Sequence, residues 1–329
     1  MRQWYASVNY GLENIIGDII KNAGAQNIKI LESALIFSCQ NELSLKCINN
    51  LFAVISSFDS KSVTEAAKKI SRLEFSPPRL NGKTFRLVVM DCGKLRAIPQ
   101  SLMGEIEKNI SRQTGLAPLR ANPGIEIWLM RRNDGKTYFM VRTQKRPPHE
   151  KTLRRGELRP DIADVMLYMA KTNKQSVIVD MFGGWGAIAA AAAESERYKK
   201  IYTGDINGEC VRLQRERLKG KRDCFAQKWD ALSLPLEDAS VDRIITDPPW
   251  GEFEKIDAPE FYDKFINEAA RILRPDGILV FLSSADIDAR QSLEKHGFLY
   301  SAAPLKINGK DTFLFCSRHT FSITHKGAP

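Results

Sequence analysis

The chain has 329 residues, of which 43% are hydrophobic and 27% are charged. This composition is typical of a folded protein with room for two or three domains, and no apolar run approaches the roughly 18 residues that a membrane span requires. The N-terminal stretch lacks the basic, apolar and cleavage-site layout of a signal peptide, so we expect a cytoplasmic protein that does not associate with membranes.

Six cysteines are scattered along the chain without a C-x-x-C pair. A chain of this length does not need disulfides, and its cysteines and histidines are not grouped at the spacing of metal ligands. We therefore expect free thiols, a reducing compartment and no metal site.

The positive charge is concentrated in the first half of the chain. Residues 1–150 hold 22 Lys and Arg against 13 Asp and Glu, whereas residues 151–329 hold 27 against 26. A basic half joined to a nearly neutral half favours a partner with a phosphate backbone. The alternative is a basic composition that only aids solubility.

Residues 1–60 are predicted to form a small α+β unit with the order strand, helix, strand, helix. Aromatic and β-branched residues indicate extended chain at residues 3–10 and 28–39. Apolar residues at helical spacing indicate a helix over residues 11–24 and a second one over residues 42–58.

A second α+β unit is predicted over residues 61–145. Its patterns indicate a helix, a strand, a longer helix that begins near Pro99, and a hairpin whose turn is Asp134-Gly135. Residues 146–158 lack periodicity and carry charges and prolines, so we interpret them as an inter-domain linker.

From residue 159 to residue 329 strands and helices alternate, which predicts a doubly wound, mostly parallel sheet with helices on both faces. The last two predicted strands, 298–309 and 310–319, are joined by a short turn. One of them therefore adds an antiparallel strand to the sheet.

Four consecutive strands of this predicted sheet end in an aspartate: Asp180, Asp205, Asp230 and Asp247. Ligands of doubly wound sheets bind at the carboxyl ends of the strands. The glycines after the first strand allow close approach of a ligand, Asp205 suits the two hydroxyls of a ribose, and Asp230 could accept from the amine of adenine. A ribose-binding carboxylate occurs with both nicotinamide dinucleotides and S-adenosylmethionine, and a single such Asp can also be a helix cap.

The stretch from Asp247 to Trp250 reads D-P-P-W. Pro248 and Pro249 have no N–H, so this segment cannot continue a central strand and must turn out of the sheet. The Asp247 carboxylate and the Pro248 carbonyl would then be two fixed acceptors for the N–H groups of an aromatic amine, with Trp250 as a stacking surface for a flipped base. The structural alternative is a tight turn capped by Asp247.

The segments "DMFGGWG", "GDI", "WDA" and "DPPW" resemble the motifs of Rossmann-fold amino-methyltransferases that use S-adenosylmethionine. The upstream segment "LRRGELRPDIADVMLYMA" is similar to the one that precedes the first strand in RNA methyltransferases with a THUMP domain. The resemblance implies a ferredoxin-like domain over residues 1–60, a THUMP domain over residues 61–145 and a class I methyltransferase domain over residues 159–329.

The resemblance also implies the roles of individual residues. The target amine would be held by Asp247, Pro248, Pro249 and Trp250. The cofactor S-adenosylmethionine would be bound by Leu158, Arg159, Pro160, Asp180, Phe182, Gly183, Gly184, Gly186, Asp205, Ile206, Asp230, Ala231 and Asp247. One departure is Trp185, which stands where the family has a small residue and is expected to place a bulky side chain near the cofactor.

The expected partner is tRNA, bound by a monomer without a metal. The implied activity is methylation of the N2 amine of a guanosine near the acceptor stem, of the position 6 or 10 type. We expect RNA contacts from basic residues of the predicted hairpin and linker: Arg131, Arg132, Arg142, Lys145, Arg146, Arg154 and Arg155.

Other functions remain open at this point. The first alternative is an N-methyltransferase for an exocyclic amine of ribosomal RNA or DNA, which would not require this basic N-terminal half. A protein-glutamine methyltransferase would typically carry N-P-P-Y, and an NAD-dependent oxidoreductase would show the regular glycine fingerprint and a proton-transfer residue. A non-catalytic RNA-binding module has no use for the Asp247 carboxylate.

Overall fold

A computed structural model describes residues 1–43, 45–77, 82–145, 153–251, 257–307 and 309–319. The chain divides into two compact units, one of Met1–Val8 with Ile20–Arg146 and the other of Asn9–Ile19 with Pro147–Pro329. The described helices include none with the length and apolarity needed to cross a membrane.

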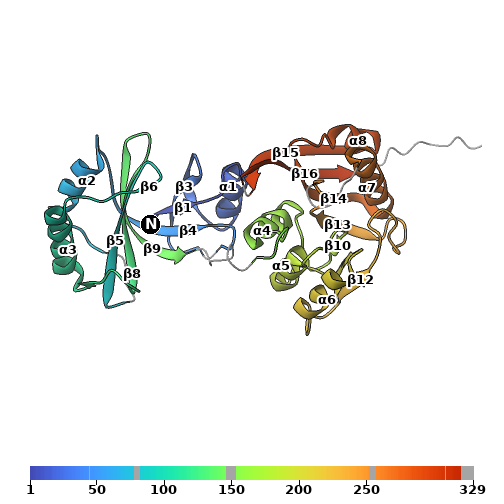
Figure 1. Cartoon of the computed structure of the whole chain (residues 1–329), viewed down its shortest axis with the longest axis horizontal. Coiled ribbons are helices and arrows are strands. Elements are labelled where there is room, and N and C mark those ends of the chain that lie inside the picture. The colour runs from blue at the N-terminus through green and yellow to red at the C-terminus, as the bar shows by residue number, and fades with distance from the viewer. Residues whose placement is uncertain (44, 78–81, 146–152, 252–256, 308, 320–329) are drawn as a thin grey trace, which may run out of the picture. The chain divides into compact units, whose positions relative to one another are not determined.

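The first unit is built on a nine-stranded sheet with the order β2-β3-β1-β4-β9-β8-β5-β6, in which β7 also pairs with β5 (Figure 1). Its elements are β1 (Arg2–Ser7), β2 (Gln26–Leu31), β3 (Ala34–Cys39), β4 (Asn50–Asp59), α2 (Val63–Ile70), β5 (Thr84–Asp91), β6 (Lys94–Leu95), α3 (Gln100–Thr114), β7 (Ala117–Pro118), β8 (Ile125–Arg131) and β9 (Lys136–Lys145). Helix α1 (Glu13–Asn22) crosses the boundary between the two units.

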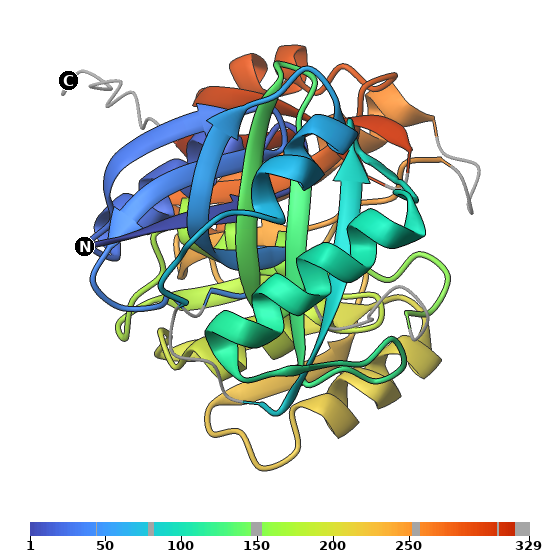
Figure 2. The ribbon, with the colours of Figure 1, turned by 90° about the vertical axis from the view of Figure 1, so that its left-hand side faces the viewer.

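The helices α2 and α3 lie on one face of this sheet (Figure 2). Their apolar side chains, among them Ile70, Ile106 and Ile110, pack with Phe85, Ile127 and Phe139 of the strands in one buried cluster. Ser62 caps α2 by accepting a hydrogen bond from the backbone of Glu65, and Gly115 ends α3 in the left-handed conformation. Strands from residues 1–60 and from residues 61–145 share this sheet, and the predicted division into two domains at residue 60 stays a prediction.

The helix predicted over residues 42–58 is wrong. Residues 50–59 form β4, a central strand that pairs with β1 on one side and β9 on the other. The run Leu51 to Ile55 is rich in β-branched and aromatic residues and is nearly continuous in its apolarity, so helical and extended periodicity could not be told apart from the sequence. Residues 50–59 adopt the extended conformation because they pair with both β1 and β9.

The second unit contains the mixed sheet β12-β11-β10-β13-β14-β16-β15, which confirms the predicted α/β fold class. Strands β10 to β14 run parallel, and β16 is antiparallel to both β14 and β15. The elements are α4 (Pro160–Met169), β10 (Val177–Asp180), α5 (Ala187–Ser195), β11 (Lys200–Asp205), α6 (Gly208–Arg217), β12 (Cys224–Lys228), β13 (Val241–Thr246), α7 (Ala258–Ile272), β14 (Leu273–Ser284), α8 (Arg290–Lys295), β15 (Phe298–Ile307) and β16 (Lys310–His319).

The core of this second unit places the strand ends. Fully buried side chains of α7, such as Tyr262, Phe265 and Ile272, pack against Ile244 of β13 and Phe281 of β14. Because β10, β11, β12 and β13 are parallel, their carboxyl ends meet at one edge of the sheet. This edge carries the aspartates singled out from the sequence.

Candidate functional site

One of the four strand-end aspartates, Asp180, is bound by a threonine at the end of the neighbouring strand β13. The Thr246 hydroxyl donates a 2.8 Å hydrogen bond to Oδ1 of Asp180 and accepts a 3.0 Å hydrogen bond from the backbone N–H of Phe182. The other oxygen of Asp180, Oδ2, is buried and has no hydrogen-bond partner among the described residues. Burial, opposed by the Thr246 hydrogen bond and aided by the charges of Asp247 and Asp205, raises the pKa of Asp180 to about 8.

A first cavity, the strand-edge cavity, opens at the ends of β10, β11, β12 and β13 and has a volume of about 400 Å³. It is lined by Met181, Phe182, Gly184, Asp205, Ile206, Asp230, Ala231, Leu232, Asp247, Pro249, Trp250, Gly251 and Phe261. The wall combines carboxylates with apolar surface, and the Ile206 side chain is 63% exposed beside Asp205. An apolar slot with a carboxylate on each side suits the ring and the hydroxyls of a nucleoside.

The carboxylates of this cavity are held by backbone N–H groups. Asp205 accepts hydrogen bonds from the N–H groups of Gly184 and Asn207, at 2.9 and 2.8 Å. Asp230 accepts one from the N–H of Leu232 at 2.9 Å. Each carboxylate is therefore fixed in orientation at the wall of the cavity.

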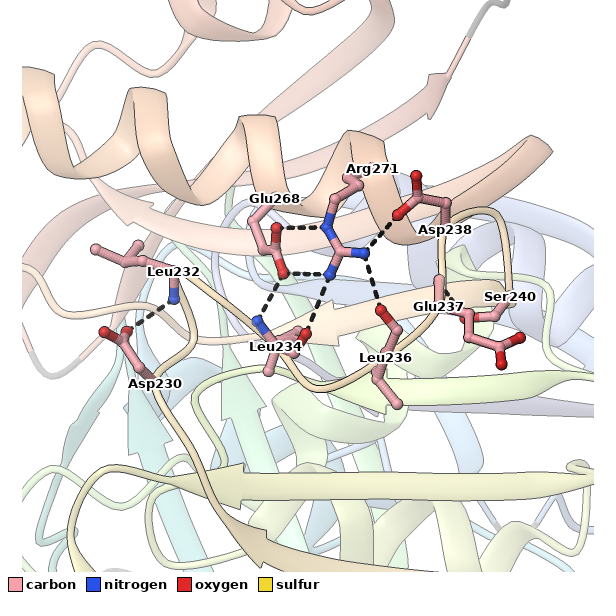
Figure 3. Close-up of polar contacts among 9 residues, drawn as sticks. All are labelled: Asp230, Leu232, Leu234, Leu236, Glu237, Asp238, Ser240, Glu268 and Arg271. Atoms are coloured by element: carbon pink, nitrogen blue, oxygen red, sulfur yellow. Dashed lines mark hydrogen bonds and ion pairs between the residues drawn. The ribbon is translucent and has the colours of Figure 1, made fainter.

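The segment 230–240, which carries part of the cavity wall, is fastened to helix α7 by Arg271 and Glu268 (Figure 3). The Arg271 guanidinium donates to the carbonyls of Leu234 and Leu236, at 3.1 and 2.8 Å, and to both oxygens of Glu268. Buried Glu268 in turn accepts from the Leu234 N–H at 2.6 Å. These hydrogen bonds to charged groups fix the loop in which Asp230, Ala231 and Leu232 lie.

A second cavity, the proline cavity, has a volume of about 200 Å³. It is lined by Gly156, Glu157, Leu158, Arg159, Asp247, Pro248, Pro249, Trp250, Ile307 and Lys310. Asp247, Pro249 and Trp250 belong to the walls of both cavities. The D-P-P-W segment therefore borders both the strand-edge cavity and this second, smaller cavity.

The Asp247 carboxyl lies where the segment leaves the sheet. The Trp250 indole N–H donates to Oδ1 of Asp247 at 3.1 Å, and the carbonyl of Pro249 accepts from the Tyr262 hydroxyl at 3.3 Å. Burial raises the pKa of Asp247 to about 7, although the Trp250 hydrogen bond lowers it. The turn is thus held from both sides by hydrogen bonds of Trp250 and Tyr262.

The glycine turn after β10 packs closely on β11. The Gly183 N–H donates to the carbonyl of Gly204 at 2.8 Å, and a Cβ added to Gly183 would lie 2.3 Å from Oγ1 of Thr203. Gly183 is therefore required for packing between two strands, whereas Gly184 lines the strand-edge cavity. Gly186 caps the N-terminus of α5 in the left-handed conformation.

Trp185 does not line either cavity. Its indole N–H donates to the carbonyl of Arg155 at 3.0 Å, and the Arg154 guanidinium lies over its ring at 5.0 Å. The expectation of a bulky side chain near the cofactor is therefore not met in this structure, because the indole turns toward the segment that precedes α4.

That segment also brings the Leu158-Arg159-Pro160 residues to the site. Leu158 and Arg159 line the proline cavity, and Pro160 is the first residue of α4. Arg159 pairs with Asp161 at 2.5 Å and donates to the Asn9 side chain at 3.0 Å. Asn9 was not singled out in the sequence, since it lies about 150 residues away along the chain.

The predicted RNA-binding residues are distributed over both units. Arg131 pairs with Asp91 at 2.8 Å, Arg142 pairs with Glu126 at 2.5 Å, and Arg132 donates to the Tyr5 hydroxyl at 2.8 Å. Lys145, Arg154 and Arg155 are exposed, and Arg146 lies outside the described residues. A role of these residues in RNA binding stays a prediction.

Sequence reasoning missed several residues of the site. Thr246 had a signal, because it is a polar residue at the end of an apolar strand and directly before Asp247. Ile307 and Lys310 had none, since they reach the proline cavity only because β15 and β16 return to the sheet. The described residues contain no group of three or more His, Cys, Asp or Glu that could hold a metal ion.

The family model and the curated relatives that match this chain are all methyltransferases. Residues 148–302 match the family described as RMKL-like, methyltransferase domain. The chain is 31% identical over 134 residues to the tRNA (guanine(6)-N(2))-methyltransferase THUMP3 of Mus musculus and 30% identical over 134 residues to the tRNA (guanine(6)-N2)-methyltransferase of Thermus thermophilus. These matches cover 36% and 39% of this chain and span only 26% and 40% of the relatives' own lengths.

Among solved structures, the fold is similar to that of TrmN from Thermus thermophilus, with a TM-score of 0.75 and 20% sequence identity. That comparison covers 97% of this chain and 100% of the other. It therefore extends the likeness of the fold over both units.

Proposed function

We propose, from the match of residues 148–302 to the RMKL-like methyltransferase domains, that the protein transfers a methyl group from S-adenosylmethionine to the N2 amine of a guanosine in tRNA. The observation that carries the proposal is the D-P-P-W segment, whose Asp247, Pro249 and Trp250 face both the strand-edge cavity and the proline cavity. A donor and an acceptor of a methyl group have to meet at such a shared wall.

The residues of the strand-edge cavity fit S-adenosylmethionine. Asp205 would hold the ribose hydroxyls, and Asp230 would accept from the adenine amine beside Ile206 and Phe182. Oδ2 of buried Asp180 has no hydrogen-bond partner among the described residues, and the cationic methionine end of the cofactor would be a fitting partner for this carboxylate. Leu158 and Arg159, which line the adjoining proline cavity, would contact that end from there.

The bound cofactor supplies an electrophilic methyl group. The chain's own residues orient the nucleophile: ionised Asp247 and the Pro248 carbonyl accept the two N–H groups of the guanine amine and direct its lone pair toward the methyl group. Trp250 lies beside Asp247 and offers its ring to the base. Asp247 has to be ionised to accept an N–H with either oxygen, so its raised pKa bears on the pH dependence of the reaction.

The RNA substrate is supported by charge and by the relatives. The excess of positive charge lies in residues 1–150, which precede the methyltransferase domain. Two relatives that share 31% and 30% identity with this chain over 134 residues are named as tRNA guanine-N2 methyltransferases. We infer that the basic first unit, as a ferredoxin-like and a THUMP part, binds the tRNA and that the second unit receives the base.

The experiment incubates the full chain and isotopically labelled S-adenosylmethionine with unmodified tRNA transcripts, a ribosomal RNA fragment and a DNA duplex, followed by mass analysis of the nucleosides. Label in N2-methylguanosine from tRNA alone is the expected result. Replacement of the acceptor-stem guanosines by inosine, which lacks the N2 amine, should abolish the label. Label in another nucleoside, or in DNA, would contradict the proposal.

A further inference from the structure

Helix α6 sends one fully buried polar side chain to the glycine turn that follows β10. Gln214 is completely shielded from solvent, and its Nε2 donates a 2.9 Å hydrogen bond to the carbonyl of Gly184. At the other end of the same amide, Oε1 accepts from the Thr203 hydroxyl of β11 at 3.4 Å. Because a carbonyl oxygen can only accept, the NH2 group of Gln214 has to face Gly184, and this fixes the orientation of the amide.

The turn also packs closely on Gln214 at two further glycines. A Cβ added to Gly183 would lie 2.6 Å from Nε2 of Gln214, and one added to Gly186 would lie 3.2 Å from its Cγ. Contacts as close as these leave the side chain little room to shift. The amide of Gln214 is therefore held at one place against the backbone of the turn.

The peptide unit that Gln214 binds belongs to the cofactor side of the site. Gly184 lines the strand-edge cavity, and its N–H donates to Oδ2 of Asp205 at 2.9 Å. The carbonyl of Gly184 and the N–H of Trp185 are part of one trans peptide unit and point in opposite directions. Because Gln214 holds the carbonyl toward α6, the N–H of Trp185 points away from that helix.

We propose that Gln214 is a positioning residue for S-adenosylmethionine, which acts by fixing the peptide unit between Gly184 and Trp185 and thereby the N–H donor of Asp205. The inference rests on the proposed function, since it requires the cofactor at the strand-edge cavity. Loss of the Gln214 donor would leave a buried carbonyl without a partner, which favours rotation of the peptide unit. A rotated unit would present an oxygen instead of an N–H to the carboxylate and hydroxyls of the cofactor.

The experiment uses Gln214→Glu, which keeps the shape of the side chain and donates to the Gly184 carbonyl only while its carboxyl is protonated. Burial raises the pKa of such a carboxyl, so the Kd of S-adenosylmethionine is measured by calorimetry on the full chain from about pH 5 to about pH 9. Charged groups beside the turn, among them Asp205 and Arg217, are the same in variant and wild type, so the ratio of the two Kd values isolates the new carboxyl.

Two further variants complete the set. Gln214→Met has a similar length and lacks the donor at every pH. The matched control is Gln227→Glu, which introduces the same charge at an exposed position of β12. Denaturant unfolding of all variants measures stability separately from cofactor affinity.

The inference predicts that Gln214→Glu binds the cofactor like the wild type at low pH and roughly tenfold more weakly at high pH. Gln214→Met should bind roughly tenfold more weakly at every pH, and Gln227→Glu should resemble the wild type. The KM for tRNA and kcat at saturating cofactor should change little. A Kd ratio of Gln214→Glu to wild type that does not vary with pH would overturn the inference, as would an unchanged Kd in Gln214→Met. A wild-type protein that binds no S-adenosylmethionine would overturn the proposed function instead.

Discussion

Thr246 and Asp180 join the ends of two neighbouring strands by a 2.8 Å hydrogen bond, and the same threonine oxygen accepts from the Phe182 N–H at 3.0 Å. The Thr246 hydroxyl lies at the end of β13, directly before Asp247. It therefore fixes both the buried Asp180 carboxyl at the end of β10 and the start of the glycine turn at Phe182. The last residue of β13, Thr246, would thus position the cofactor side of the site, and the residue directly after the strand, Asp247, would hold the substrate.

Replacing Thr246 with valine keeps the shape and removes this hydroxyl. We expect a loss of about 1–3 kcal/mol in the free energy of unfolding, because both the Asp180 carboxyl and the Phe182 N–H lose a buried partner. Since Phe182 lines the strand-edge cavity, the Kd of S-adenosylmethionine should also rise. Calorimetry of binding and denaturant unfolding measure the two effects, and Thr246→Ser is the control that should behave like the wild type. Unchanged binding in the valine variant would show that the hydroxyl does not position the cavity.

The pKa of Asp180, raised to about 8, makes stability depend on pH. Its value in the unfolded chain is about 4, so the native state binds the proton more tightly. The stabilising contribution is complete below about pH 4 and is lost as the pH rises through about 8. The Tm of the cofactor-free protein should therefore fall between pH 6 and pH 9, and it should fall less in Asp180→Asn. Identical pH dependence of the two proteins would contradict the burial of an ionisable group there.

The Trp250 indole N–H should set the pH dependence of activity through Asp247. Its hydrogen bond favours the ionised carboxylate, whose pKa burial has raised to about 7. Activity should rise with pH through about 7, because the amine needs an ionised acceptor. In Trp250→Phe the aromatic ring remains but the donor is lost, so the rise should move to higher pH. The measurement is the pH profile of kcat/KM for the cofactor, which reports on groups of the free enzyme. If activity rose at the same pH in the wild type and in Trp250→Phe, the proposed effect of the Trp250 N–H would be wrong.

Arg271 should control cofactor affinity from outside the cavity. Lysine at this position cannot serve both backbone carbonyls and both oxygens of Glu268, so the segment 230–240 loses its attachment to α7 (Figure 3). We expect the KM for S-adenosylmethionine to rise roughly tenfold in Arg271→Lys, the equivalent of about 1.4 kcal/mol, with kcat at saturating cofactor nearly unchanged.

The control for this effect is Arg274→Lys. Arg274 forms an ion pair with Asp242 at 2.8 Å, near the amino end of β13, and therefore on the side of the sheet away from the cavities. Arg274→Lys should therefore lower the stability of the protein without changing the KM for S-adenosylmethionine. If both variants raised the KM equally, Arg271 would have no specific part in positioning the loop.

The fold of the second unit could be predicted because its hydrophobic periodicity and its strand-end residues indicate the same architecture. Strands alternate with helices, and the aspartates of the strand ends recur in chain order, so Asp205, Asp230 and Asp247 lie at one cavity as the pattern indicates. The apolar run 51–55 is equally compatible with a helix and with a strand. The prediction of a helix over residues 42–58 failed there, because pairing with β1 and β9 makes residues 50–59 a strand.

Other parts of the site depend on contacts between distant residues. Asn9 meets Arg159 and Asp161 across about 150 positions, and Lys310 reaches the proline cavity through the ladder of the last two strands. The direction of the Trp185 side chain and the burial that raises the pKa of Asp247 likewise depend on packing. Spacing in a sequence carries no information on such contacts.

The account as a whole depends on Asp247 as the acceptor that orients the substrate amine beside the cofactor. Asp247→Ala therefore has to be tested by single-turnover methylation of tRNA together with calorimetry of S-adenosylmethionine binding. We predict that methylation is abolished while the Kd of the cofactor changes little, because Asp205 and Asp230 would still hold its nucleoside part. Methylation at a wild-type rate by Asp247→Ala would contradict the account.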